Sequence, residues 1–233
     1  MLNSTNVFFV LPDPVYNQDH CQIYPHFTKA DSSFLYITLL ENLYEIFSAL
    51  FPREDIFVCL NEKDKNNLSR ETLSPFLSNN LFYFNDAAFA NEFVSLFDKR
   101  RSDAKNFIFV HPDFVGLTKT DILQMLDLLL LEDDVLLLKK TLHKKIALFA
   151  TNKFQNEIPG LIHKKNFVCD SALKKLCALD YQLYKLKNVF SLAHANDFKE
   201  LYKMLSRKEN YACCSKKMHD RFTHLFIEYK ELL

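Results

Sequence analysis

Glycine is almost absent from this chain, whose 233 residues include only Gly116 and Gly160. Average usage of about 7% would give roughly 16 glycines at this length. Glycine-rich phosphate loops, dinucleotide-binding turns and the nucleophile elbow of α/β-hydrolases each need glycines at fixed spacing. The sequence therefore excludes these sites, and any phosphate that the protein binds must meet helix N-termini or cationic side chains instead.

Composition limits the class of protein further. Hydrophobic residues make up 48% of the chain, which is enough for a sizeable core, and the length fits one domain. Basic and acidic residues balance at 29 each. Because a neutral chain has no overall field that attracts a polyanion, neither nucleic acid nor a membrane is predicted as a partner.

The start of the chain and its most apolar stretch both indicate a cytoplasmic protein. Asn3, Asn6 and Asp13 interrupt the first residues, so no signal peptide is predicted. The leucine-rich stretch 122–142 contains four acidic residues, so it is not expected to cross a bilayer.

The six cysteines match no zinc-binding spacing. We expect them to be reduced thiols, in keeping with a cytoplasmic protein. Adjacent Cys213 and Cys214 would not readily bridge to each other, and their role stays open. His20, Cys21 and His26 remain an alternative as part of a metal site.

Short apolar runs alternate with helical patterns along the chain, which is typical of a sheet covered by helices. The predicted strands are 7–11, 56–60, 81–84, 107–110, 135–138, 146–149, 167–169 and 189–192. The predicted helices are 31–50, 87–99, one beginning after Thr118, 171–187, one from Asn196 and one from Ser215. The short link 140–143 predicts a hairpin. We therefore expect an α/β protein, with a three-layer α/β/α architecture and a mixed, mainly parallel sheet.

The chain is expected to form one domain, which consists of two halves and a C-terminal helix. Residues 1–118 are predicted to be a nucleotide-binding half and residues 119–206 an acceptor half. Residues 207–233 form a C-terminal helix whose apolar stripe includes Met218, Phe222 and Leu225. This stripe is expected to join the core, with the face of a homodimer as the alternative.

Polar residues at the ends of predicted strands are the candidates for chemistry, because ligands bind beyond the carboxyl ends of the strands in an open α/β sheet. Asp113 follows the most apolar strand and could hold Mg²⁺ or Mn²⁺ against a diphosphate, with His111 beside it. Asp13 follows the first strand. Lys29 precedes the first helix, where it could meet a phosphate.

Each candidate also has a structural alternative. Asp113 could cap a turn or the next helix, and His111 could be a hydrogen-bonded edge residue. Lys29 could be a solvated side chain. Four lysines around the predicted hairpin are interpreted as a solvated face, or as contacts to an anionic partner; they are Lys139, Lys140, Lys144 and Lys145. No catalytic residue can be assigned from spacing alone.

The segment 111–118, His-Pro-Asp-Phe-Val-Gly-Leu-Thr, resembles the G-S-D-x-P-x-L-T segment of a family of GT-A-like glycosyltransferases. These bacterial proteins are related to molybdenum-cofactor and phospholactate guanylyltransferases. Segments 35–43 and 189–201 resemble two further motifs of the family. The resemblance implies a GT-A fold that binds a nucleotide-sugar or nucleotide with a divalent metal. It places Asp113 on the family's metal-binding acid and Asp197 on its last acid.

The chain departs from the family where ligands are held. Lys29 is the only basic residue of the first-loop element, and the segment 140–144 has no glycine where the family has D-G-G. Ser191 and Ala193 stand near the positions of two further acids. Two functions therefore stay open, a divergent glycosyltransferase or nucleotidyltransferase and a non-catalytic descendant that binds a ligand or a protein.

Overall fold

The computed structural model describes most of the chain. The described residues are 5–11, 26–66, 80–85, 91–95, 104–143, 145–155, 158, 174–175, 178, 181–192 and 194–233. The strand expected at 167–169 and the candidate Asp13 lie outside them. No helix of the described part is long and apolar enough to cross a membrane.

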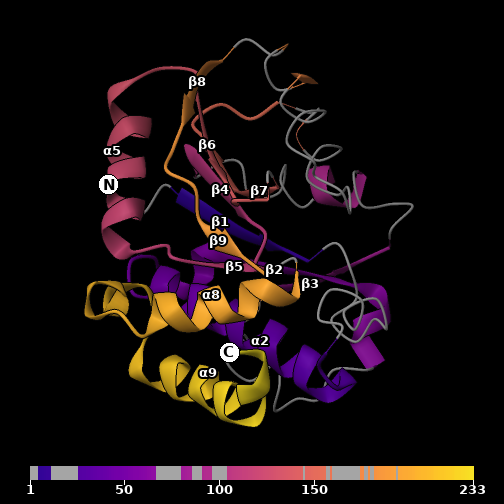
Figure 1. Cartoon of the computed structure of the whole chain (residues 1–233). Helices are drawn as coiled ribbons and strands as arrows, with labels where there is room; N and C mark the ends of the chain where they lie inside the picture. Colours follow the sequence, from indigo (N-terminus) through magenta and orange to yellow (C-terminus); the bar gives the residue numbers. More distant parts are fainter. Residues whose placement is uncertain are drawn as a thin grey trace.

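A sheet of seven described strands lies at the centre, in the order β3-β2-β1-β4-β7-β6-β8 (Figure 1). Its strands are β1 (Thr5–Val10), β2 (Ile56–Asn61), β3 (Leu81–Phe84), β4 (Asn106–Val110), β6 (Val135–Lys140), β7 (Ile146–Thr151) and β8 (Gln182–Lys185). Four of the six neighbouring pairs are parallel, and only β7 runs against its two neighbours. This confirms the predicted α/β class and the mixed, mainly parallel sheet.

The central strands are buried on both faces, which explains their unbroken apolar runs. In β1, Val7 and Phe9 face the helices α2 (Lys29–Ser48) and α5 (Lys119–Leu131). Phe8 and Val10 face the opposite side, where Phe93 of a short helical segment covers them. The sheet thus has core on both sides.

Four phenylalanines stack across neighbouring strands on the second face. Phe57 of β2 lies 4.9 Å from Phe8 of β1, measured between ring centroids. Phe8 lies 5.3 Å from Phe109 of β4, and Phe109 lies 4.6 Å from Phe149 of β7. Each pair also faces across its ladder in register. This phenylalanine ladder joins the parallel strands to the antiparallel β7.

A helical layer covers α2 on the side away from the sheet. It contains α8 (Ala195–Leu205) and α9 (Lys216–Glu228), seen stacked with α2 in the lower part of Figure 1. A small sheet of β5 (Phe114–Val115) and β9 (Phe190–Ser191) lies between the two layers. Thirteen of the twenty residues of α2 are buried as a result.

The C-terminal stripe is core, as the sequence predicts. Met218, Phe222 and Leu225 are fully buried against residues of α2 and α8. Beyond α9, the hydroxyl of Tyr229 donates to Asp31 at 2.6 Å and accepts from the Thr28 amide at 3.0 Å. The stripe is therefore not available as the homodimer face that was the alternative.

Gly116 occupies a position that only glycine takes readily. Its φ is 98°, in the left-handed region, directly after β5. Thr118 two residues later caps α5, and Asp121 completes a capping box with it. One of the two glycines in the chain is thus placed at the turn that joins the strand β5 to a helix.

Two predictions from the sequence are wrong. The helix expected at 171–187 does not extend through its last part, because Gln182–Lys185 is strand β8 and pairs in parallel with β6. Lys139 is not on a solvated face. It is buried, and its ammonium lies 3.4 Å from the Asp121 carboxylate. In both cases a contact with a distant residue decides the conformation.

We predict that Phe109→Ala lowers the free energy of unfolding by about 3–5 kcal/mol, because it removes one of the two inner members of the phenylalanine ladder and leaves a cavity. Phe82→Ala, on the edge strand and half-buried, is the matched control and should cost clearly less. Urea denaturation followed by circular dichroism measures both. Equal losses for the two variants would contradict the central role of the ladder.

Candidate functional site

The candidate site lies at the carboxyl edge of the sheet. The strands β1, β2, β4, β6 and β8 run in one direction, so their carboxyl ends meet there. The antiparallel β7 begins at the same edge. The residues after β4 therefore lie beside those before β7, as the backbone bond of 2.9 Å from the His111 amide to the Ala147 carbonyl shows.

His111 is buried where β1, β4 and β7 meet. Burial lowers the pKa of its imidazole to about 4; a hydrogen bond with the Val10 backbone opposes this shift, and the nearby Lys145 ammonium adds to it. The side chain is therefore neutral at pH 7. This fits the hydrogen-bonded edge histidine that was the alternative in the sequence, and it excludes His111 as a cation for a phosphate. Contact with a ligand through its neutral ring stays a prediction.

Asp113 is half-buried two residues further on, and its amide donates to the His111 carbonyl at 3.0 Å. The β4–β7 register ends at Val110 and Leu148, and residues 112–113 form a bend before β5. Burial raises the pKa of the Asp113 carboxyl, while the Lys145 ammonium and the residue's own amide lower it. Burial outweighs the other two effects, so the pKa of the Asp113 carboxyl is raised overall.

Lys145 is one of the four lysines that the sequence interprets as a solvated face or as contacts to an anionic partner, and it lies at this edge of the sheet. The turn between β6 and β7 holds it in place, since the Thr141 amide donates to the Lys145 carbonyl at 2.8 Å and the Lys145 amide donates to the Thr141 hydroxyl at 3.2 Å. Thr141 is itself bridged to Val189.

A second cluster joins the same turn to the start of α8. The Nε2 atom of His143 lies 2.9 Å from Oδ2 of Asp197, and the His194 amide donates to the same oxygen at 2.7 Å. The rings of His143 and His194 meet edge to face with their centroids 5.0 Å apart. Asp197, the acid that the resemblance matched, is therefore engaged by two donors. The two histidines were not predicted.

Lys29 lies at the exposed first turn of α2. Thr28 caps this helix, and the Asp31 carboxylate accepts from the hydroxyls of Thr28 and Tyr229, each at 2.6 Å. A carboxylate therefore already lies next to the amides that a phosphate would meet. A role for Lys29 and for Asp13 in binding a ligand stays a prediction.

The divalent metal that the resemblance implied has no cluster of ligands among the described residues, and the metal role of Asp113 stays a prediction. No group of three or more histidine, cysteine, aspartate or glutamate side chains among the described residues could hold a metal ion. Asp197 is bound to His143 and to the His194 amide. Hard cations take several oxygen ligands, so Asp113 would need oxygens from a substrate phosphate to complete a metal site.

Comparison with known proteins gives matches in structure only. No protein-family model matches this chain, and no curated protein sequence matches it. A crystal structure of a candidate nucleotide-diphospho-sugar transferase from Desulfovibrio desulfuricans G20 is similar over 98% of this chain and 99% of that chain. The TM-score is 0.71 and the sequence identity 14%.

Two further structures match less well. A cytidylyltransferase from Leptospira borgpetersenii serovar Hardjo-bovis covers 98% of this chain and 96% of its own, with 9% identity and a TM-score of 0.49. A protein from Mycobacterium tuberculosis H37Rv in complex with manganese covers 85% of this chain and 97% of its own, with 11% identity and a TM-score of 0.48. Of these three structures, only the first is similar enough in its overall fold to assign the fold of this chain. It shows the fold of nucleotide-diphospho-sugar transferases, as the resemblance implied.

We predict that buried, neutral His111 makes stability fall in acid. An unfolded histidine takes up a proton below pH 6.5, whereas folded His111 does so only near pH 4. Because of His111, the free energy of unfolding should therefore fall progressively between pH 6.5 and pH 4, by about 3 kcal/mol in total. Urea denaturation from pH 7 to 4 should show a smaller fall for His111→Gln than for the wild type. His26→Gln, at an exposed histidine, is the control, and equal curves for all three proteins would contradict the prediction.

Proposed function

We propose that this chain binds a nucleotide or a nucleotide-sugar at the carboxyl edge of its sheet, as a divergent glycosyltransferase or nucleotidyltransferase. One observation carries the proposal, the similarity over almost the whole of both chains to the candidate nucleotide-diphospho-sugar transferase. The position of Asp113 and His111, directly after a central parallel strand, supports it because ligands of open α/β sheets bind there.

We assign the two halves of the chain the roles expected from the sequence, nucleotide binding and acceptor binding. Residues 1–118 would bind the nucleotide, with the loop that contains Asp13 and ends before Lys29 near its phosphates. Residues 119–206 would bind the acceptor. In this half, the turn that contains His143 lies next to the start of α8, where His143 contacts Asp197. Transfer leaves negative charge on the departing phosphate, so a fixed positive charge nearby would lower the barrier.

A second function, a non-catalytic module that binds a nucleotide-like ligand or a protein, is favoured by the turn between β6 and β7. The segment 140–144 has no glycine, and the side chain of His143 in it is bound to Asp197. A backbone that carries side chains cannot approach a ligand as closely as a glycine backbone. An acceptor site could be narrowed or lost for this reason.

The cellular compartment and the assembly of the protein are also proposals. We propose that the protein works in the cytoplasm, in keeping with cysteines that are expected to be reduced thiols. Dimerisation would need a surface other than the buried stripe of α9.

We predict that a screen of nucleotides and nucleotide-sugars by thermal shift identifies at least one stabilising ligand. A ligand that binds only the folded protein adds about 2.7 kcal/mol of stability at a hundredfold excess over its dissociation constant. No shift with any member of the screen would contradict the proposed function. If a nucleotide-sugar stabilises the protein, chromatography of that ligand after incubation distinguishes the two functions. A transferase should slowly transfer the sugar to water, whereas a binding module should leave the ligand intact.

A further inference from the structure

Three side chains that meet between the β6–β7 turn and α8 form a histidine cluster, which consists of His143, His194 and Asp197. Two connections of the chain place this cluster close to the residue after β4. In the small sheet, Phe114 directly after Asp113 pairs with Ser191, three residues before the second histidine of the cluster. The first histidine lies in the turn that enters β7, and the Ala147 carbonyl of β7 accepts from the His111 amide. The histidine cluster therefore borders the candidate site.

The imidazole of His143 is oriented by a carboxylate through one of its two ring nitrogens. Its Nε2 atom lies 2.9 Å from Oδ2 of Asp197, and 26% of the His143 side chain is exposed. When Nε2–H donates to the carboxylate, the lone pair of the neutral ring is on Nδ1. A carboxylate in this position stabilises the imidazolium that forms when the ring takes up a proton. His143 thus has the partner and the solvent access that a general base needs.

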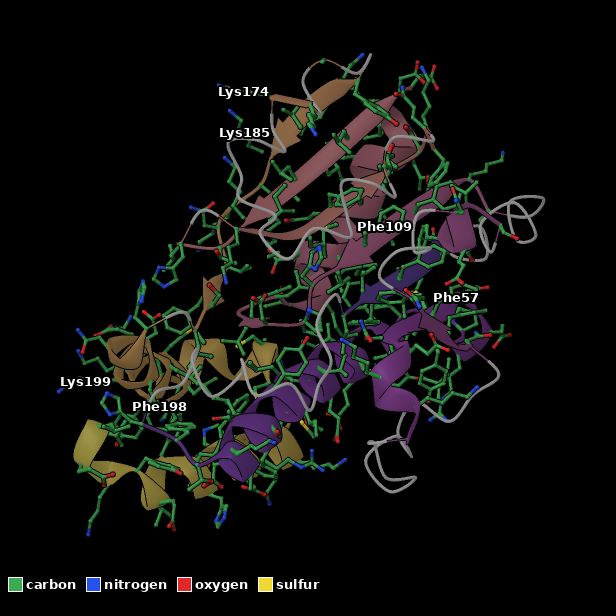
Figure 2. All side chains as sticks on the ribbon, turned by 90° about the vertical axis from the view of Figure 1, so that its right-hand side faces the viewer. Phe57, Phe109, Lys174, Lys185, Phe198 and Lys199 are labelled. Carbon is green, nitrogen blue, oxygen red and sulfur yellow. The ribbon has the colours of Figure 1, made fainter. Side chains whose placement is uncertain are left out.

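Asp197 is itself held in place by the first turn of α8. The His194 amide donates to the same oxygen, Oδ2, at 2.7 Å. The next residue, Phe198, is buried in the helical layer, with its ring 5.1 Å from that of Phe226 in α9. Lys199 is exposed, and Figure 2 shows it at the outer margin of the molecule. Because α8 is anchored in this way, the carboxylate that orients His143 belongs to a rigid element.

We propose that His143 is a catalytic base, which takes the proton of an acceptor hydroxyl at Nδ1, and that Asp197 is its positioning residue. The acceptor oxygen forms a bond to the anomeric carbon of the nucleotide-sugar while the bond from that carbon to the phosphate oxygen breaks. The electron pair of the broken bond leaves with the nucleoside diphosphate. The proton passes from the imidazolium to solvent after the transfer.

The inference rests on the proposed function and narrows it to one class of reaction. A hydroxyl keeps its proton at pH 7, so a positioned base assists its attack. A phosphate acceptor, as in nucleotidyl transfer, is already ionised at this pH and needs no base. The pair of His143 and Asp197 therefore favours glycosyl transfer to a hydroxyl over nucleotidyl transfer to a phosphate.

Hydrolysis of a nucleotide-sugar tests the base, because water can take the place of the acceptor hydroxyl. The wild-type protein would be incubated with UDP-glucose, GDP-mannose, ADP-glucose and dTDP-glucose. Calorimetry measures the binding of each compound, and chromatography measures the release of the nucleoside diphosphate. We expect at least one compound to be bound and slowly hydrolysed.

Substitutions at His143 separate a base from a contact that only joins the turn to α8. His143→Gln keeps an amide that can donate to Asp197 but cannot take up the proton. It should lower kcat by at least about a hundredfold and leave the dissociation constant almost unchanged. In His143→Ala, imidazole added to the solution should restore part of the hydrolysis, because it can accept the proton. His224→Gln, at an exposed histidine of α9, is the matched control and should behave as the wild type.

The positioning role of Asp197 has its own test. Asp197→Asn no longer stabilises an imidazolium, so kcat should fall by at least about tenfold with little change in the dissociation constant. Asp197→Glu keeps the negative charge and should recover part of the rate. A wild-type rate in Asp197→Asn would overturn the positioning role.

The outcomes distinguish the inference from the proposed function. Hydrolysis at the wild-type rate by His143→Gln would overturn the inference and leave the proposed function standing. So would a loss of hydrolysis that imidazole does not restore and that a loss of binding accompanies, because His143 would then have a structural role. Binding of a nucleotide-sugar without hydrolysis by the wild type would also overturn the inference and favour a binding module. If no compound binds, the proposed function fails together with the inference.

Discussion

Stacking of Phe57, Phe8, Phe109 and Phe149 connects the four strands on which the candidate site depends. The shortest spacing, 4.6 Å, joins β4 to β7, where the sheet changes from parallel to antiparallel. Aromatic pairs contribute about 0.5–1.5 kcal/mol beyond the burial of their area. Because the ladder fixes the register of β4 against β7, it also determines that the residues after β4 meet those before β7. The position of His111 beside Ala147 is thus a consequence of how the core packs.

Strands that are buried on both faces could be predicted from the sequence, because their apolar runs contain all the information that is needed. The runs at 7–11, 56–60 and 107–110 became β1, β2 and β4. β8 could not be predicted in this way. Leu179, Leu183 and Leu186 are spaced as on a helix, yet 182–185 adds to the sheet beside β6. A strand at the edge depends on a partner distant in sequence, which local periodicity does not describe.

Some residues of the candidate site could likewise be predicted from the local sequence, and others could not. Asp113 and His111 could be found because a residue directly after a central strand has a predictable position. His143 and His194 could not, since their neighbours are set by the antiparallel register and by the arrival of α8. Lys139 was assigned to a solvated face because its neighbours are lysines, but the alternation of β6 directs it toward Asp121. A lysine run therefore says little about exposure when it ends a strand.

The bond between Tyr229 and Asp31 joins residues that are 198 positions apart. It belongs to a contact in which α9 covers Leu35 and Leu39 on the outer side of α2. During synthesis α2 leaves the ribosome long before α9 exists, so these leucines have no cover while most of the chain is being made. The sheet also pairs over long sequence distances, which slows folding. Until α9 is made, the nascent chain therefore exposes an apolar helix face, and surfaces of this kind make incompletely folded chains prone to aggregate.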